Sequence, residues 1–211
     1  MKQTLKTIIR SVRSINGNSL AEFATTTALM ATLAATAAPK LSEMAENTKG
    51  EKAMNEIDKI LTQARNFYQD TADNEGRGRF PGQDKFDMAV GGYTTENTAM
   101  LGVDNFTSWT ADEGSKWRSV FGVDNADNPQ AADGLVTNDL DETCGTCPSN
   151  KAGHEEWIDL FGGNTLSSPF QDGHYIYVVV PGSGSGTDVV PPVLYVADAE
   201  NPSDFNNLLA P

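Results

Sequence analysis

Two cysteines, Cys144 and Cys147, are the most reactive side chains that this sequence offers. Redox catalysis would need the pair at the start of a helix that follows a strand, where the thiol pKa is lowered. The pair instead lies in a run of Asp, Thr, Asn and Pro that predicts a loop. Zinc needs four ligands, and the two histidines, His154 and His174, lack zinc-finger spacing. Redox and zinc chemistry stay open, but we favour a local disulfide formed in an oxidising compartment.

Acidic side chains offer a second chemistry, because calcium takes six to eight oxygen ligands from Asp- and Glu-rich loops. A short acidic group, Asp198, Glu200 and Asp204, follows the last strand-like run of the chain. A longer acidic stretch contains no Lys or Arg, and we favour a solvated surface for it because EF-hand spacing is absent. This stretch contains Asp124, Asp127, Asp133, Asp139, Asp141 and Glu142.

The sequence contains no recognisable catalytic set. The Gly-Ser-Gly-Ser-Gly run at residues 182–186 could suggest phosphate binding, but a phosphate loop must open a helix. Here Pro191, Pro192 and a strand-like run follow, which indicates a flexible turn. Neither a Ser/His/Asp set nor a pair of catalytic carboxylates can be identified, so we expect that the protein is not an enzyme.

Charge divides the chain of 211 residues very unevenly. The first seventeen residues contain Lys2, Lys6, Arg10 and Arg13 and no acid, which gives about +4. The formal net charge is −14, so the remainder carries −18, from −14 minus 4. Phosphate binding needs clustered Lys and Arg, so we expect no nucleic-acid partner.

Residues 20–38 form an Ala- and Thr-rich segment in which Glu22 is the only charged residue. As a helix, this segment would span roughly 28 Å, about the thickness of a bilayer core. It has few large apolar residues, so it predicts a marginal membrane helix, and a soluble helix that packs through small side chains stays open. The basic residues before it favour a cytoplasmic N-terminus. The large apolar residues are Leu20, Phe23, Leu29, Met30 and Leu33.

A second helical pattern follows Pro39, which is expected to kink the helix and not to end it. Apolar residues recur there at three- and four-residue steps, while intervening residues such as Lys52 and Glu56 suit solvent. A helix over residues 19–71 would be roughly 80 Å long, too long for one compact domain, so one half must lie in lipid or against other subunits. The apolar face contains Ala53, Ile57, Ile60, Leu61, Ala64, Phe67 and Tyr68.

The rest of the chain predicts a small β-rich domain. Residues 175–180 and 193–197 are rich in β-branched and aromatic side chains and predict an antiparallel hairpin. A short helix is possible from Glu113 to Phe121, and a short apolar turn from Trp157 to Phe161. We therefore expect an α+β fold of lollipop shape, with a long N-terminal helix packed on a small antiparallel sheet. The expected segments are 1–17, 18–44, 45–72 and 73–211: a basic leader, an apolar half-helix, an amphipathic half-helix and a globular domain.

The spacing of three N-terminal residues resembles a known export signal. Gly17 is followed at the fifth position by Glu22 and at the twenty-second by Pro39, after a basic leader. This pattern resembles the class III signal of type IV pilins and of type II secretion pseudopilins. Asn18 stands where that family usually has Phe, and the Ala/Thr-rich segment replaces its Leu, Ile and Val. The run Ala21-Glu22-Phe23-Ala24 also resembles the small pilins of tight-adherence systems.

The resemblance extends to two later segments. Ala64-Arg65-Asn66-Phe67-Tyr68, leading into Gly78-Arg79-Phe80-Pro81, is similar to the helix end and following loop of the major pseudopilin. Residues 168–177 are similar to the turn that enters the first strand of its C-terminal sheet. The resemblance is thus good over residues 1–82 and 166–198 and poor between them.

The resemblance implies a life history and a set of site residues. A prepilin peptidase would cleave between Gly17 and Asn18, and Glu22 would pair with the freed amine of a neighbouring subunit. The chain would sit in the inner membrane, meet an assembly platform there, and then enter a homopolymeric filament that is periplasmic or extracellular. Calcium would bind in the C-terminal loop near Asp198 and Asp204, and no other cofactor is expected.

A second class of function stays open. The chain could be a membrane-anchored module, displayed singly, that holds a ligand or calcium through residues 84–150. Such a protein would remain monomeric in the membrane with its leader intact, whereas a filament subunit would be cleaved and polymerised. The sequence does not distinguish pilus, pseudopilus and tight-adherence systems, nor adhesion, secretion, motility and DNA uptake.

Overall fold

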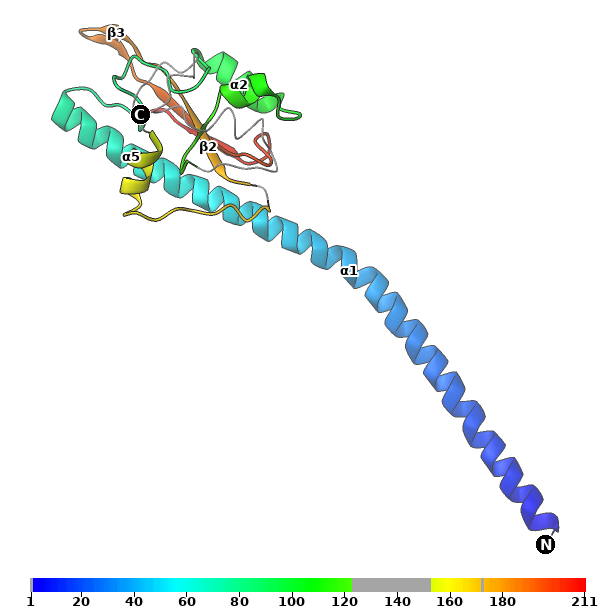
Figure 1. Ribbon diagram of the computed structural model, residues 1–211. Coiled ribbons are helices and arrows are strands. Elements are labelled where there is room, and N and C mark those ends of the chain that lie inside the picture. Colours follow the sequence, from blue (N-terminus) through cyan, green and yellow to red (C-terminus); the bar gives the residue numbers. More distant parts are fainter. Residues whose placement is uncertain (1, 123–152, 172) are drawn as a thin grey trace. The chain divides into compact units, whose positions relative to one another are not determined.

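The computed structural model of this protein describes residues 2–122, 153–171 and 173–211, with side chains from residue 19 onward except that of Ala111 (Figure 1). The chain divides into two compact units, residues 1–48 and residues 49–211. The helices are α1 (Lys2–Glu75), α2 (Glu96–Asp104), α3 (Ala111–Ser115) and α5 (Gly153–Leu160). The strands are β1 (Arg118–Ser119), β2 (Tyr175–Val180), β3 (Ser183–Ser185), β4 (Asp188–Val190), β5 (Val193–Asp198) and β6 (Asn206–Leu209).

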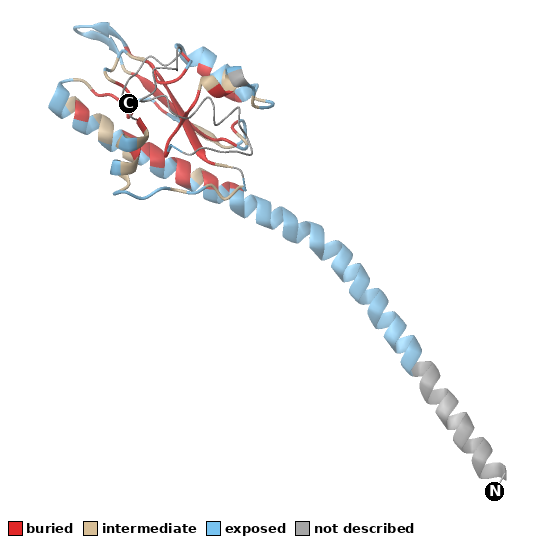
Figure 2. Cartoon of the chain, viewed as in Figure 1, coloured by how far each residue is buried: buried red, intermediate tan, exposed pale blue. Residues whose placement is uncertain are grey.

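The first unit consists of helix, and its residues from Ser19 to Thr48 are all exposed (Figure 2). The helix continues through Pro39, as the pattern on both sides of this residue predicts. Within α1 no acidic residue lies in the first turn and no basic residue in the last turn. Charged side chains therefore do not complement the macrodipole at either end, and tertiary packing must stabilise the part of α1 that belongs to the second unit.

The second unit is built around the face of α1 that the sequence pattern predicts. Ala53, Ile57, Ile60 and Ala64 are fully buried, and Leu61 is nearly so, which confirms this part of the predicted apolar face. Beyond Ala64 the face is less deeply buried: Phe67 and Tyr68 are half-buried, and Tyr68 packs against the same core.

The prediction that Glu56 faces solvent is wrong. Its side chain is buried, and Oε2 accepts a hydrogen bond of 3.1 Å from the hydroxyl of Tyr175 on β2. Lys52 lies one turn earlier on α1, with its Nζ 3.8 Å from Glu56 Oε1. A buried carboxylate is tolerable when it is hydrogen-bonded and near a cation, and here it fixes the position of α1 along the sheet.

The main sheet has four antiparallel strands in the order β1-β2-β5-β6. The predicted hairpin of β2 and β5 is confirmed, with Tyr177 opposite Val196. Every residue of β2 and β5 is buried, because α1 covers one face and a second apolar layer covers the other. This double burial explains why both strands are continuous apolar runs without alternation. The second layer contains Tyr93, Ala99, Val103 and Trp117.

Two local predictions need correction. The linker between β2 and β5 contains the two-stranded pair β3 and β4, where a flexible turn alone was expected. The short helix predicted from Glu113 to Phe121 instead covers Ala111–Ser115, and Arg118 and Ser119 pair with β2. Trp117 is the reason for the change, since its buried side chain packs edge-on against Tyr93 below the sheet edge.

Candidate functional site

The exposed part of α1 carries an unusual amount of apolar surface. Its large apolar side chains are each 63–71% exposed, whereas the equivalent side chains in the second unit form a core. Contiguous apolar surface of this kind marks a protein–protein or membrane contact. The exposed side chains are Leu20, Phe23, Leu29, Met30, Leu33, Leu41 and Met44.

The hydroxyl groups in this segment are already hydrogen-bonded inside the helix. Thr25, Thr26, Thr27, Thr32 and Thr36 each donate to a carbonyl three or four residues earlier, at 2.7–3.1 Å. Transfer of the segment to lipid or to a helix interface would therefore not leave these hydroxyls unsatisfied. Among the described residues, α1 is long and apolar enough to cross a membrane, a criterion that signal sequences and core helices also meet, so it is a candidate membrane anchor.

Glu22 is the exception to this apolar surface. It is exposed, it is the only charged residue between Ser19 and Pro39, and the described side chains provide no ion-pair partner for its carboxylate. An uncompensated carboxylate opposes burial of the segment unless a cation arrives with the surface that covers it. Glu22 therefore gives the exposed part of α1 a specific chemical requirement.

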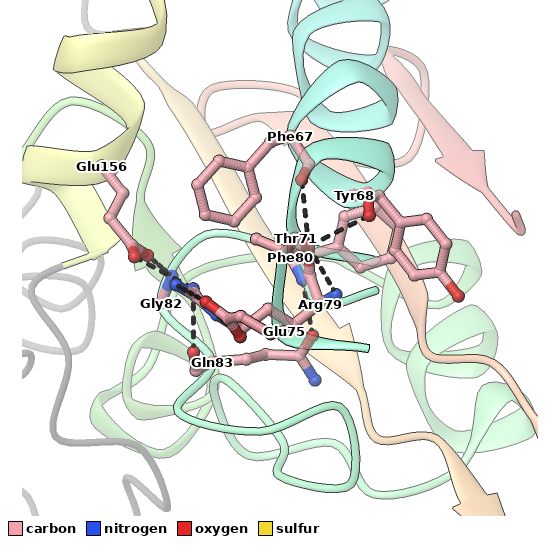
Figure 3. Close-up of polar contacts among 9 residues, drawn as sticks. All are labelled: Phe67, Tyr68, Thr71, Glu75, Arg79, Phe80, Gly82, Gln83 and Glu156. Carbon is pink, nitrogen blue, oxygen red and sulfur yellow. Dashed lines mark hydrogen bonds and ion pairs between the residues drawn. The ribbon is translucent and has the colours of Figure 1, made fainter. Parts of the chain in front are cut away.

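An ion-pair cluster around the buried side chain of Arg79 lies at the end of α1 (Figure 3). Arg79 is 6% exposed, and its Nε lies 3.0 Å from Glu75 Oε2 on α1. Its Nη1 lies 2.9 Å from Glu156 Oε1 on α5 and 3.1 Å from the carbonyl of Gln83. Burial opposes the charged form, but the hydrogen bonds and charges of Glu75 and Glu156 outweigh it and raise the pKa of Arg79.

The same cluster satisfies the backbone of the loop after α1. Glu156 Oε2 accepts the Gly82 amide at 2.7 Å, and Thr71 Oγ1 accepts the Arg79 amide at 3.0 Å. Gln83 Oε1 accepts the amide of Phe80 at 2.8 Å. The loop, the end of α1 and α5 are thus joined by charge-assisted hydrogen bonds, so the cluster has a structural role.

Replacement of Arg79 by Lys should lower the free energy of unfolding. A lysine keeps the charge but cannot form the planar fork to Glu75 and Glu156, and the loss should be about 1–3 kcal/mol. Denaturant unfolding of the full chain measures this change. The matched control is Arg65→Lys at an exposed position of α1, for which a change within about 0.5 kcal/mol is expected. Equal effects of both substitutions would show that the cluster contributes nothing specific.

The C-terminal loop places the two predicted calcium ligands in different environments. Asp198 is fully buried, and its Oδ2 accepts from Ser168 Oγ at 2.6 Å while Oδ1 accepts from the Glu200 amide at 2.9 Å. Asp204 is exposed. Among the described residues, no three His, Cys, Asp or Glu side chains are grouped to hold a metal ion. Calcium binding thus stays a prediction, and it would require Asp198 to exchange hydrogen bonds for metal.

The structure describes only some of the remaining predicted site residues. Cys144, Cys147 and the long acidic stretch lie outside the described residues, so their disulfide and their surface role stay predictions. Gly17 and Asn18 lie in the helical backbone of α1, and their side chains are not among those described. Sequence reasoning missed Glu156, which lies 77 positions from Arg79 and carries no local signal.

No protein-family model, curated protein or solved structure matches this chain. Its function is therefore argued from its own residues and their geometry.

Replacement of Asp198 by Asn tests the role of the buried carboxylate. Burial raises the pKa of Asp198 above its ordinary value of 3.8, although the hydrogen bonds from Ser168 and Glu200 oppose this shift. The folded carboxyl therefore binds its proton more tightly than the unfolded one, so its titration lowers stability as the pH rises above 3.8. The Oδ1 of Asn can still accept the Glu200 amide, and its Nδ2 can donate to Ser168 Oγ in place of the bond that Ser168 now donates. We therefore expect an unfolding free energy at pH 7 within about 1 kcal/mol of wild type.

Two readouts distinguish this role from calcium binding. In the first, the pH dependence of thermal unfolding above pH 4 should be flatter for Asp198→Asn and unchanged for the exposed control Asp204→Asn. In the second, melting is compared with calcium and with chelator, because a ligand specific to the native state raises its stability. A calcium-dependent rise in Tm that both substitutions abolish would establish the predicted metal site, whereas an unchanged Tm would remove it.

Proposed function

We propose that this chain is a structural subunit of a filament of the type IV pilus or type II secretion pseudopilus kind. It assembles through the exposed part of α1, residues 19–48. The observation that carries this proposal is the run of large apolar side chains that α1 leaves exposed over that part. The spacing of Gly17, Glu22 and Pro39 supports it independently, because it resembles the pattern of a prepilin signal.

Burial of the exposed apolar side chains supplies the driving force for assembly. A fully buried Leu, Met or Phe contributes about 1.5–3 kcal/mol relative to an exposed one. Each subunit offers seven such side chains on this part of α1, so a packed bundle of these helices gains from every added copy. Because the threonine hydroxyls are hydrogen-bonded within the helix, the same segment can lie in a bilayer before assembly without unsatisfied hydroxyl groups.

The proposal assigns a partner to each part of the N-terminus. The basic leader keeps the N-terminus in the cytoplasm, where a prepilin peptidase removes it. The apolar half-helix rests in the inner membrane and meets an assembly platform, and further copies of the chain cover it in a periplasmic or extracellular filament. The acidic second unit is then the part displayed on the filament, and the proposal assigns no catalysis to it.

Removal of the leader is the first test. The exported protein should have the mass of a chain that begins at Asn18, because the peptidase would cut after Gly17. Intact-mass spectrometry of the exported protein measures this directly. A Gly17→Leu variant, which lacks the small residue before the cut, should keep its leader and serves as the control. A wild-type chain that begins at Met1, or after an Ala near residue 38, would contradict the proposal and favour a singly displayed, membrane-anchored module.

Glu22→Ala should abolish filaments and leave the second unit folded. Once the leader is removed, Asn18 carries an ammonium group four residues before Glu22 in sequence. If both charges are buried in a filament, loss of the carboxylate leaves the amine uncompensated, at a cost of about 3–5 kcal/mol per contact. Such a loss weakens each contact more than a hundredfold by about 1.4 kcal/mol per factor of ten.

The measurement compares the yield of sheared filaments with thermal unfolding of the same variant. Glu51→Ala is the matched control, since Glu51 is another exposed acid of α1 and lies after the assembling residues 19–48. Its filament yield should equal that of wild type. Normal filament yield from Glu22→Ala would show that the carboxylate only complements the helix dipole, which contributes about 0.3–1 kcal/mol.

A further inference from the structure

Among the residues of α1 whose side chains are described, Gly50 is the first that is buried, after a continuous exposed run over residues 19–49. Its backbone is helical and does not require glycine, and glycine is unfavourable in a helix interior relative to alanine. A lack of room for a side chain explains the glycine, because an added Cβ would lie 2.9 Å from Cε1 and 3.2 Å from Cζ of Phe205. The ring of Phe205 therefore occupies the position where any other residue would place its side chain.

Phe205 ends the segment that joins β5 to β6, residues 199–205. The segment is closed by its own hydrogen bonds, since the Phe205 amide donates to the carbonyl of Asn201 at 3.0 Å. Its carbonyl accepts from the Asp198 amide at 2.9 Å, which fixes Phe205 to the end of β5. The ring is half-buried and packs against the main core.

A second segment, between α5 and β2, holds the ring from another side. Phe170 stacks on Phe205 with ring centroids 5.0 Å apart and an interplanar angle of 27°. Two residues earlier, Ser168 Oγ donates to Asp198 Oδ2 at 2.6 Å, and it also accepts the Phe170 amide at 3.1 Å. The second segment is therefore joined to the first by the stacked rings and to the end of β5 by the bond between Ser168 and Asp198.

We propose that residues 199–205 form a C-terminal latch, which closes on Gly50 and sets the point where α1 begins to pack on the sheet. The next buried residue of α1 is Ala53, and three residues further on Glu56 is bonded to Tyr175. Opening of the latch would move the start of packing from Gly50 to Ala53, roughly 4–5 Å along the helix at 1.5 Å per residue. The latch is thus a conformational device that adjusts how much of α1 the second unit holds.

The latch belongs to the second unit alone, so it holds whether or not the chain polymerises. Its consequence for assembly rests on the proposed function, because an open latch would leave a longer part of α1 for contacts with other copies. The test therefore uses the full chain as a detergent-solubilised monomer, in which filament formation plays no part.

The test is a double-mutant cycle of Gly50→Ala and Phe205→Ala, measured by thermal unfolding. Without the ring, Gly50→Ala should raise Tm by about 2–4 °C, the gain from replacing a helical glycine in a chain of this size. With Phe205 present, this gain should be absent or reversed. Asn55→Ala is the matched control, an exposed position on α1 whose effect should be the same in both backgrounds. If Phe205→Ala fails to fold, Phe205→Leu replaces it, because Leu lacks the ring end that meets Gly50.

Hydrogen exchange then tests the opening itself. In Gly50→Ala, the amides of Asp198 and Phe205 should exchange at least about tenfold faster than in wild type, because local opening governs their protection. In Asn55→Ala they should not change. An equal shift of Tm by Gly50→Ala in both backgrounds would overturn the proposal. So would unchanged exchange, since it would show a close contact that does not open.

Discussion

The packing of α1 against β2 and β5 is the interaction on which the rest of the second unit depends. Alternate residues of β2 divide between two clusters: Tyr175, Tyr177 and Val179 face the layer of Ile57 and Ile60, and their neighbours face the opposite layer. A strand buried on both faces needs a cover on each side. Because α1 supplies one of these covers, the sheet cannot be stable without the part of the helix that begins at Gly50.

This dependence explains which parts of the fold could be predicted from sequence. The buried face of α1 and the strands β2 and β5 have strong local patterns, because helix and strand periods appear within a few residues. Glu56 was assigned to solvent since its burial is decided by Tyr175, a residue 119 positions away. The sequence pattern predicts helix at β1 because the pairing of β1 with β2 is also remote in sequence. Both errors come from tertiary contacts that override local preference.

The residues of the candidate site also differ in whether local sequence or distant contacts decide their role. Glu22 could be identified from sequence because its chemistry is local: one acid within an apolar run is costly wherever that run is buried. The cluster around Arg79 could not be identified from sequence. Glu75 lies only one turn away, but Glu156 belongs to α5, far away in the sequence. Asp198 and Asp204 looked equivalent as sequence, yet one is buried with two hydrogen bonds and the other is exposed. Their difference depends on Ser168, which a sequence pattern does not connect to them.

The two parts of α1 therefore satisfy their apolar side chains by different means. From Gly50 onward the helix is covered by the chain itself, and that cover is specified by buried polar contacts such as the bond between Glu56 and Tyr175. Before Gly50 the helix has satisfied its threonine hydroxyls but not its apolar side chains or the carboxylate of Glu22. A surface that lacks only apolar contacts and one cation is complementary to lipid only in part, because lipid tails supply no charge. Under the proposed function, a copy of this chain without its leader would bring both an apolar helix and an ammonium group, and this complementarity would favour self-assembly over permanent residence in a membrane.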